Sequence, residues 1–361
     1  MVDLRVFKDI EIKSHKGPYK VYFDNNAISN IDNTLIENGV FIIDENVSIL
    51  YKKELTKITE NSRYLIIQAS EDNKSITEFN LYIKKLVEMK IRRDQPLIAI
   101  GGGIIQDITC FLASTLMRGL PWVFIPTTLL AQADSCIGSK SSINSGDLKN
   151  ILGTFTPPSK VIIDTRFLGT LPNNAILSGI GEMLKVHAID SPESFTKISY
   201  NYDQLRKDDK IMQEFIYSSL LFKKRLIELD EFDRGPRNVM NYGHSFGHAI
   251  ESATNFEIPH GIAVTIGMDI ANFVALDMGI LEQEDFDQMH QVLAKNSEVV
   301  KEISINLDKM IEAISKDKKN TASNLRLILP NKKRIITIGL YKNDAKFRNS
   351  IVKYIDTYRK N

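Results

Sequence analysis

The first third of the chain alternates short apolar runs with a helical pattern, and this alternation limits the fold more than any other feature. The runs GVFIID (39–44), RYLIIQAS (63–70) and PLIAI (96–100) each have the length of a buried strand. A helical pattern at 75–89 separates the second run from the third. Most of its apolar face consists of Ile76, Phe79, Leu81, Ile83 and Leu86. Strand, helix and strand in this order predict an α/β fold with a parallel sheet.

The third run leads directly into Gly101, Gly102 and Gly103, and the helical sequence IIQDITCFLASTLMRG follows. Glycines between a strand and a helix let a ligand approach the backbone, and the free N–H groups of the helix favour a pyrophosphate. The triplet is not a complete GxGxxG fingerprint, so a tight strand-to-helix turn without a ligand is the alternative. The next run, PWVFIP, is followed by Thr127, Thr128 and Asp134, and in open α/β sheets ligands gather at this edge.

Long helical patterns dominate after the apolar run KVIIDT (160–165) and the turn at Leu171-Pro172. We therefore place a domain boundary near Pro172, with an α/β domain over 1–172 and a mostly helical domain over 173–361. The later runs LRLILP (325–330) and RIITIGL (334–340) are expected to form a small hairpin or extended segments. The charged C-terminal tail carries no clear pattern.

Three of the six histidines lie between positions 244 and 260, in the stretch RNVMNYGHSFGHAIESATNFEIPH. On a helix, Asn241, His244 and His248 would project from one face because they are three and four residues apart. His260 follows a break and is expected in a loop. Two imidazoles and a distant carboxylate would make a catalytic zinc site with an open position. Ordinary helix-face or buried histidines are the alternative.

A second candidate lies in SGIGEMLKVHAI, where Glu182 and Lys185 are three residues apart. Most such pairs are exposed ion pairs worth a few tenths of a kcal/mol. Here the neighbours are glycines, Met183 and Leu184, and a buried carboxylate without a partner would be costly. A metal ion bound to the carboxylate would remove that cost.

Composition excludes several classes of function. Lys+Arg 46 against Asp+Glu 45 gives a formal charge of +1, so no net field attracts nucleic acid or an anionic membrane. We find no apolar run of about 18 residues and no signal-peptide pattern, so neither a membrane span nor secretion is expected. Cys110 and Cys136 lack metal-ligand spacing and are expected to be free thiols of a cytoplasmic protein.

Five motifs occur in a particular order along the chain: IAIGGGIIQD, RGLPWVFIPTTLLAQADSCIGSK, KNILGTF, SGIGEMLKV and RNVMNYGHSFGHAIE, followed by His260. Together they resemble the 3-dehydroquinate synthase family of sugar-phosphate cyclases. The resemblance implies a Rossmann-like NAD-binding domain, a mostly helical metal-binding domain and an active site in the cleft between them. It also implies a cytoplasmic homodimer, in which Arg118 reaches the neighbouring subunit's site.

The resemblance assigns roles residue by residue. The implied ligands of Zn2+, or of another divalent ion such as Co2+, are Glu182, His244 and His260. The implied NAD-binding residues are Asp44, Asn46, Glu71, Lys74, Gly102, Gly103, Asp107, Thr127 and Thr128. The implied substrate-binding residues are Asp134, Lys140, Lys149, Asn150, Lys185, Lys223, Arg237, Asn241 and His248. One of Lys318 and Lys319 is expected to add a phosphate contact.

The reaction implied by the resemblance converts 3-deoxy-D-arabino-heptulosonate 7-phosphate to 3-dehydroquinate. NAD oxidises C5, phosphate is eliminated, the hydride returns, and the ring closes by aldol addition. The enzyme would be a phosphate-eliminating lyase of the shikimate pathway, with no net redox change. Such chemistry needs a hydride acceptor, a Lewis acid and a cationic phosphate pocket, and the lysines, Arg237 and Asn150 would supply the pocket.

Several positions depart from the family pattern. Ser139 and Ser142 stand where the family usually has glycine, Asp147-Leu148 replaces its Pro/Gly approach to Lys149-Asn150, and Gln106 stands where glycine is common. Another sugar phosphate, of the 2-deoxy-scyllo-inosose or valiolone type, is therefore an alternative substrate. Lys223 and Arg237 match groups that meet a carboxylate and favour the keto acid. A metal-dependent NAD polyol dehydrogenase and a catalytically silent NAD-binding protein are less favoured alternatives.

Overall fold

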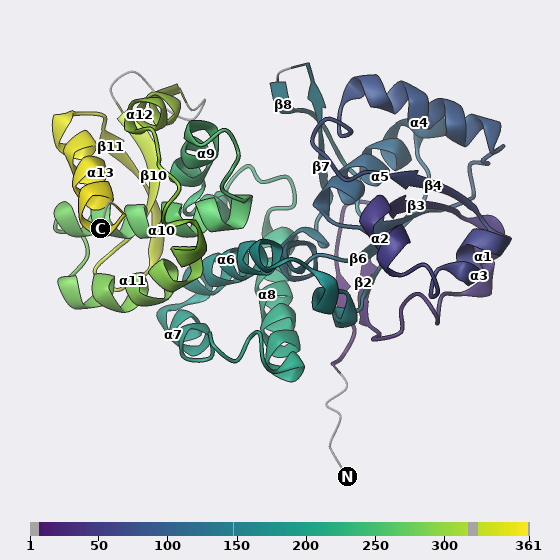
Figure 1. Cartoon of the computed structure of the whole chain (residues 1–361), viewed down its shortest axis with the longest axis horizontal. Coiled ribbons are helices and arrows are strands. Elements are labelled where there is room, and N and C mark those ends of the chain that lie inside the picture. Colours follow the sequence, from purple (N-terminus) through teal and green to yellow (C-terminus); the bar gives the residue numbers. More distant parts are fainter. Residues whose placement is uncertain (1–6, 147, 317–323, 360–361) are drawn as a thin grey trace, which may run out of the picture. The chain divides into compact units, whose positions relative to one another are not determined.

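The computed structural model describes residues 7–146, 148–316 and 324–359. The chain forms two compact units. The first comprises Met1–Leu171 together with Lys223–Arg234, and the second comprises Pro172–Phe222 and Gly235–Asn361. The chain therefore returns briefly to the first unit after it has entered the second. Each unit is described by itself below (Figure 1).

The first unit is built on a seven-stranded sheet in the order β1-β2-β9-β6-β5-β3-β4. Only β1 and β2 pair antiparallel, and the other neighbours are parallel. The strands are β1 (Ile10–Ile12), β2 (Tyr19–Phe23), β3 (Val40–Asp44), β4 (Arg63–Ile67), β5 (Leu97–Gly101), β6 (Trp122–Pro126) and β9 (Lys160–Ile163). The predicted α/β fold with a parallel sheet is confirmed, whereas strands β1 and β2 were not predicted from the sequence.

The burial of each strand follows from its place in the sheet. Every residue of β3, β5 and β6 is buried because these strands have neighbours on both sides and helices on both faces. The edge strand β4 instead alternates, with Leu65 and Ile67 buried and Tyr64 and Ile66 exposed. Apolar runs thus identified the central strands, and alternation marks the edge.

Helices cover both faces of the sheet (Figure 1). The side chains of α1 (Asn33–Asn38), α2 (Glu45–Leu50) and α3 (Thr56–Asn61) pack into one apolar cluster with β3, β5 and β6. The longer helices α4 (Ile76–Glu88) and α5 (Gly103–Thr115) lie on the opposite side of the sheet. The parallel strands therefore direct their carboxyl ends, and the loops that follow them, toward one edge of the unit.

The predicted apolar face of α4 is only partly right. Phe79 and Leu86 are buried, but Ile76 and Leu81 are 37% and 45% exposed, and Tyr82 is buried in their place. Phe79, Tyr82 and Leu86 are spaced three and four apart and form one stripe. Leu81 lies on the opposite face of the helix, and Ile76 is in the first turn.

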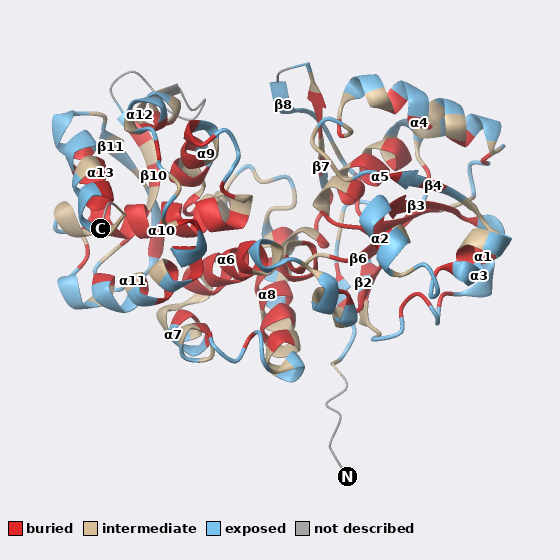
Figure 2. Ribbon diagram, viewed as in Figure 1, coloured by how far each residue is buried: buried red, intermediate tan, exposed pale blue. Residues whose placement is uncertain are grey.

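The serine-rich stretch after Lys140 is a β-hairpin. Strand β7 (Lys140–Ser145) pairs antiparallel with β8 (Leu148–Phe155). Ser141 and Ile143 are buried, whereas most of β8 is exposed (Figure 2). Serine and glycine usually indicate turns, so the composition of this stretch does not predict a strand. The strand forms because the rest of the unit covers alternate side chains of β7.

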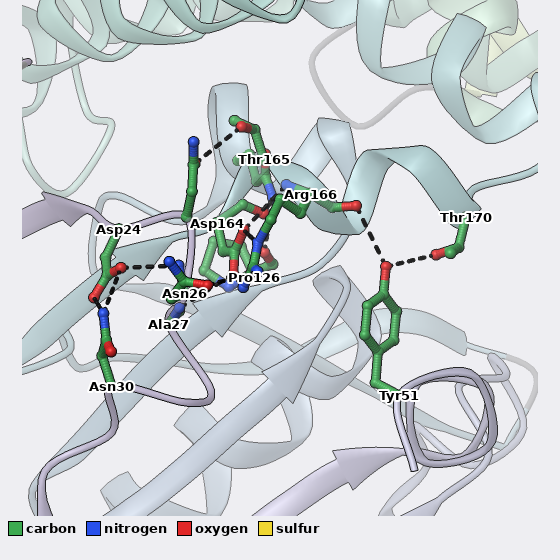
Figure 3. A network of polar contacts seen from close by, with 12 residues as sticks. Asp24, Asn26, Ala27, Asn30, Tyr51, Pro126, Asp164, Thr165, Arg166 and Thr170 are labelled. Atoms are coloured by element: carbon green, nitrogen blue, oxygen red, sulfur yellow. Dashed lines mark hydrogen bonds and ion pairs between the residues drawn. The ribbon is translucent and has the colours of Figure 1, made fainter. Parts of the chain in front are cut away.

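A polar network fixes the carboxyl ends of β6 and β9 (Figure 3). Asp164, which directly follows β9, is 1% exposed and accepts hydrogen bonds from the backbone N–H of Ala27 at 3.1 Å and from Arg166 Nη2 at 2.7 Å. Gln132 Nε2 donates to the carbonyl oxygens of Pro126 at 3.0 Å and Asp164 at 2.9 Å. Gln132 lies in the π-helical turn η2 (Ala131–Ser135), so the network anchors this turn to the sheet edge.

The second unit is mostly helical. Its helices are α6 (Asn173–Asp190), α7 (Pro192–Tyr200), most of α8 (Asp209–Leu229), α9 (His244–Ala253), α10 (His260–Asp277), α11 (Gln283–Ser297), α12 (Leu307–Lys316) and α13 (Ala345–Tyr358). The predicted hairpin is present as β10 (Asn324–Pro330) and β11 (Ile336–Lys342), and the tail without a clear pattern forms α13.

Helix α10 is the centre of the second unit, because every residue of Gly261–Ala275 is buried (Figure 2). Helices α6, α9 and α11 pack against it. Although α10 contains the polar residues Thr265, Asp269 and Asn272, most of its residues are apolar, as expected of an interior helix that neighbouring helices cover. Among the described residues, no helix combines the length and hydropathy needed to cross a membrane.

We predict that Asp164→Ala lowers the free energy of unfolding by about 2–4 kcal/mol, because it leaves a buried N–H and the Arg166 guanidinium without their acceptor. Urea unfolding measures the change. The matched control is Asp24→Ala in the same network, where the partly exposed carboxylate accepts from Asn30, and we expect a loss of about 1 kcal/mol or less. Equal effects of the two substitutions would contradict this account.

Candidate metal and cofactor site

The candidate metal cluster depends on a close crossing of α6 and α10. A Cβ atom added to Gly181 would overlap the carbonyl oxygen of Gly261, and one added to Gly261 would overlap the carbonyl oxygen of Ser178. Only glycine lets the two backbones approach this closely. Glu182 follows Gly181 and His260 precedes Gly261, so the crossing brings these two side chains together.

Helix α9 adds the other two histidines. It begins after Gly243, whose φ of 77° turns the chain from the 3-10 helix η4 (Pro236–Asn241) into the new helix. Gly247 packs against the backbone of Val264 on α10. His244 and His248, one turn apart on α9, therefore lie beside His260 at the start of α10, with ring centroids 5.3 and 5.8 Å from that of His260.

Two sequence-based expectations about this stretch are wrong. Asn241 does not share a helix with His244 and His248, because η4 ends at Asn241 and the left-handed Gly243 separates it from α9. His260 is not in a loop but is the first residue of α10. In both cases the position of a glycine or proline decided where a helix begins, and residue spacing did not reveal it.

The geometry of the cluster suits a divalent metal. Glu182 Oε1 lies 3.4 Å from His260 Nε2 and 3.8 Å from His244 Nε2. Ligand atoms about 2.0–2.2 Å from a tetrahedral zinc are roughly 3.3 Å apart. One nitrogen each of His244, His248 and His260 also lie within 4.8 Å of one another. Distances alone therefore do not separate His248 from the predicted ligands Glu182, His244 and His260.

Hydrogen bonds orient the two predicted histidine ligands. His260 Nδ1 lies 3.2 Å from Glu251 Oε2, and His244 Nδ1 lies 3.2 Å from the carbonyl oxygen of Tyr242. When Nδ1 carries the proton, each Nε2 has its lone pair free for a metal, as in many carboxylate–histidine–metal sites. Glu251 is not among the residues predicted from the sequence. Its position three residues after His248, in the motif GHAIE, was the available signal.

Charges around Glu182 keep it ionised although it is 1% exposed. Burial raises the pKa of this carboxyl, but the ammonium of Lys185, 2.5 Å away, together with His260 and His244, lowers the pKa well below its usual value. Neither carboxylate oxygen has a hydrogen bond of good geometry among the described residues. A buried, ionised carboxylate with unsatisfied oxygens beside imidazoles is the chemistry of a metal ligand.

The two histidines differ in protonation. Burial and the nearby Lys185 ammonium lower the pKa of His244 well below its usual value. For His260, burial alone would lower the pKa, but the carboxylates of Glu182 and Glu251 raise it to about 10. His244 is thus neutral and able to coordinate a metal at neutral pH, whereas His260 exchanges a proton for the metal when it binds one.

In the first unit, the turn from β5 into α5 fits an anionic cofactor. Gly102 precedes the helix, makes no side-chain cap, and leaves the first N–H groups of a long helix available. A Cβ atom on Gly102 would come within 2.8 Å of Thr128 Cγ2, so a larger residue would not fit there. At the end of β3, the Asp44 side chain caps α2 by accepting from the N–H of Asn46 at 2.8 Å. Thr127 is buried.

Contacts with the hairpin join several predicted binding residues in one network. Lys74 Nζ lies 3.2 Å from Asp107 Oδ2 and 2.9 Å from Asn150 Oδ1. Asn144 Nδ2 donates to Glu71 Oε2 at 3.0 Å. Residues predicted for the cofactor (Glu71, Lys74 and Asp107) and for the substrate (Asn150) are thus neighbours, although they are far apart in the sequence.

Two further lysines of the first unit are paired with carboxylates. Lys223 Nζ lies 2.8 Å from Asp134 Oδ1 and donates to the Asp134 carbonyl oxygen at 2.6 Å. Lys140 forms an ion pair with Asp233, a residue that the sequence analysis missed. Segment Lys223–Arg234 therefore supplies partners to both predicted substrate-binding residues Asp134 and Lys140. Lys149 and Arg118 are exposed.

Models of two sequence families match consecutive parts of the chain: the N-terminal domain of 3-dehydroquinate synthase matches residues 64–178, and the C-terminal domain matches residues 179–320. A 3-dehydroquinate synthase from Alkaliphilus oremlandii (strain OhILAs) is 34% identical over 344 residues, which cover 93% of this chain and 94% of the relative.

The chain belongs to the 3-dehydroquinate synthase family.

Solved structures of cyclases share its fold. A 2-deoxy-scyllo-inosose synthase, crystallised with carbaglucose-6-phosphate, NAD+ and Co2+, gives a TM-score of 0.82 at 20% identity and covers 96% of this chain and 100% of its own. A 2-epi-5-epi-valiolone synthase from Streptomyces hygroscopicus subsp. jinggangensis 5008, with NAD+ and Zn2+ bound, gives a TM-score of 0.82 at 23% identity. The match covers 94% of this chain and 97% of the synthase.

The second unit places the remaining predicted residues of this family member around the same helices. Lys185, on α6 with Glu182, is 2% exposed, and Arg237, in η4, is 6% exposed. Asn241 Nδ2 donates to the carbonyl oxygen of Asn238 at 3.1 Å. Lys318 and Lys319 lie outside the described residues, so the predicted phosphate contact is not placed.

We predict that Gly261→Ala destabilises the protein by about 2–3 kcal/mol, because its Cβ atom forces α6 and α10 apart. The same displacement separates Glu182 from His260, so bound metal, measured by atomic emission after dialysis against zinc, is expected to fall to the level of His260→Ala. Gly169→Ala is the control, because a Cβ atom there meets nothing within 4 Å. Full zinc content in Gly261→Ala would refute the role of the crossing.

Proposed function

We propose that this chain is a 3-dehydroquinate synthase that converts 3-deoxy-D-arabino-heptulosonate 7-phosphate to 3-dehydroquinate and phosphate. It would act as a cytoplasmic, NAD- and metal-dependent lyase of the shikimate pathway. The observation that carries the proposal is the buried, ionised Glu182 beside the imidazoles of His244 and His260, in a chain of this family. The two buried free thiols, Cys110 and Cys136, are compatible with a reducing compartment.

Glu182, His244 and His260 would hold the metal, and Zn2+ or Co2+ suits two imidazoles and one carboxylate. When bound, such an ion polarises the reacting hydroxyl of the substrate. Lys185 keeps Glu182 ionised, Glu251 and the Tyr242 carbonyl hold the imidazole rings in orientation, and the close α6–α10 crossing fixes the distance between ligands. These groups preorganise the ligand set before an ion arrives.

We further propose that the domain predicted over residues 1–172 binds NAD and that the domain predicted over 173–361 binds the metal. The uncapped start of α5 would accept the pyrophosphate, because its free N–H groups favour anions. When bound, NAD accepts a hydride from the substrate and returns it, so the reaction has no net redox change. The proposed NAD-binding residues are Asp44, Asn46, Glu71, Lys74, Gly102, Gly103, Asp107, Thr127 and Thr128.

The proposed substrate-binding groups are mainly cations and amides, which suit a phosphate and a carboxylate. Arg237 offers the planar, bidentate donor set that a carboxylate prefers, and Lys223 is the second cation proposed for it. The ion pairs of Lys223 with Asp134 and of Lys140 with Asp233 hold both ammonium groups in place. The other proposed members are Lys149, Asn150, Lys185, Asn241 and His248.

The proposal predicts that zinc-loaded protein with catalytic NAD releases phosphate from 3-deoxy-D-arabino-heptulosonate 7-phosphate and forms 3-dehydroquinate. The measurement follows free phosphate and the ultraviolet absorbance of the dehydrated product. Turnover only of glucose 6-phosphate or sedoheptulose 7-phosphate would select another cyclase, since the fold is shared with such enzymes. Net accumulation of NADH with a polyol would select a dehydrogenase.

We also propose a homodimer in which Arg118 acts in the partner subunit's site. Arg118 is exposed on the 3-10 helix η1 (Leu116–Arg118), with a φ of 67°. Arg118→Ala and His260→Ala are each expected to be inactive. Dissociated and reassociated together in equal amounts, they are expected to recover about a quarter of the wild-type activity, because each mixed dimer then contains one intact site. No recovery, despite mixed dimers seen by native mass spectrometry, would show that Arg118 acts within its own subunit.

A further inference from the structure

The carboxamide of Asn150 is held by two donors that reach the same atom. Lys74 Nζ and Ser142 Oγ each lie 2.9 Å from Asn150 Oδ1. An ammonium group can only donate hydrogen bonds, so the atom that faces Lys74 must be the amide oxygen. The NH2 group of Asn150 is therefore turned away from both donors, and its two N–H bonds are the part of the side chain left for a ligand.

The backbone around Asn150 is fixed as well. Asn150 has a φ of 52°, and its N–H donates to Asn144 Oδ1 at 2.9 Å. The Asn144 amide donates in turn to Glu71, both to the carbonyl oxygen and to Oε2, at 3.0 Å. Asparagine tolerates the left-handed conformation better than most residues. The remaining freedom of Asn150 is thus the orientation of its side chain.

Lys74 alone holds that side chain weakly, because its ammonium is shared. Asp107 Oδ2 lies 3.2 Å and Glu71 Oε1 3.5 Å from Lys74 Nζ, in addition to Asn150. Both carboxylates attract the ammonium more strongly than a neutral amide does. A second donor is needed to keep the amide oxygen of Asn150 in place, and the Ser142 hydroxyl supplies it.

The backbone N–H and the hydroxyl group of Ser142 bind different acceptors. Its backbone N–H donates to Asp107 Oδ1 at 3.0 Å, a bond that any residue at this position can make. Its hydroxyl has one proton, and Asn150 Oδ1 at 2.9 Å is a nearer acceptor than Asp107 Oδ2 at 3.4 Å. The glycine usual in the family would keep the first bond and lose the second.

We propose that Ser142 is a positioning residue that acts through Asn150. It turns the Asn150 amide so that the NH2 group donates to an anionic oxygen of the substrate, its phosphate group. Ser142 itself does not touch the substrate. This inference rests on the proposed function, in which Asn150 binds a sugar phosphate, and it adds a residue that the family pattern does not contain.

A double-mutant cycle tests the proposal. We expect Ser142→Ala to raise the KM for the sugar phosphate about three- to tenfold with kcat changed less than about twofold, the size of one lost orienting hydrogen bond. Asn150→Ala is expected to raise KM further. In the Asn150→Ala background, Ser142→Ala should have no additional effect, because the residue through which it acts is gone.

Three comparisons separate this role from a general structural one. Ser142→Thr retains a hydroxyl and should restore most of the affinity. Ser145→Ala, on the same strand, removes a hydroxyl that makes no hydrogen bond within the described part of the chain, and should behave as wild type. The Kd for NAD should change less than about twofold in Ser142→Ala, because the backbone bond to Asp107 remains.

Additive effects of Ser142→Ala and Asn150→Ala on KM, or a wild-type KM in Ser142→Ala, would overturn the proposal. Failure of the proposed function is distinguished by a second readout, the Kd of inorganic phosphate measured by calorimetry with NAD present. If the wild type does not turn over the heptulosonate phosphate, the same cycle in phosphate Kd still decides the role of Ser142. An affinity for phosphate that Asn150→Ala leaves unchanged also counts against it.

Discussion

The close contact between α6 and α10 determines the candidate metal site. Glycines at 181 and 261 let the two backbones touch, and the residues next to them in the chain are Glu182 and His260. The distance between a carboxylate and an imidazole is thereby fixed by backbone packing, which is far stiffer than side-chain rotamers. A glycine also positions α9, because Gly247 packs on the backbone of Val264 in α10 and thereby brings His244 to the cluster. Three helices held by glycine contacts form the frame of the site.

This frame accounts for an arrangement that is unfavourable by itself. Glu182 is ionised in the interior, where the ammonium of Lys185 and the imidazole of His260 balance its charge. In a buried ion pair of this kind, the Coulomb attraction seldom exceeds the free-energy cost of desolvating both groups unless other partners satisfy the remaining lone pairs. The rigid packing of α10, buried from Gly261 to Ala275, supplies the stability that holds the ionised group in position. An unfavourable buried charge of this kind is expected where a protein keeps a binding site ready.

Some parts of this structure could be predicted from the sequence because a local pattern determines them. The apolar runs that became β3, β5 and β6 are strands buried on both faces, and the glycines after β5 start a helix. Other parts depend on contacts that are distant in the chain. Ser141 and Ile143 form a strand because the rest of the unit covers them, and serine gave no sign of this. The site pairs Glu182 with His260, and Lys140 with Asp233, could come only from a family resemblance or from the fold.

Two of the departures from the family pattern, Gln106 and Ser142, have a common physical effect. Gln106 Nε2 donates to the carbonyl oxygen of Ser135 at 2.6 Å, and Ser135 Oγ donates to Gln106 Oε1 at 2.6 Å. This reciprocal pair ties α5 to the turn that contains Asp134, as Ser142 on β7 is tied to Asn150 on β8 and to Asp107 on α5. A glycine at either position could make no side-chain bond. Both departures therefore add support behind residues proposed to bind ligands and leave the proposed carboxylate-binding Lys223 and Arg237 in place. The side chains of Gln106 and Ser142 add hydrogen bonds behind the proposed binding residues and replace none of the groups proposed to contact the substrate. They are therefore a weak reason for preferring another sugar phosphate.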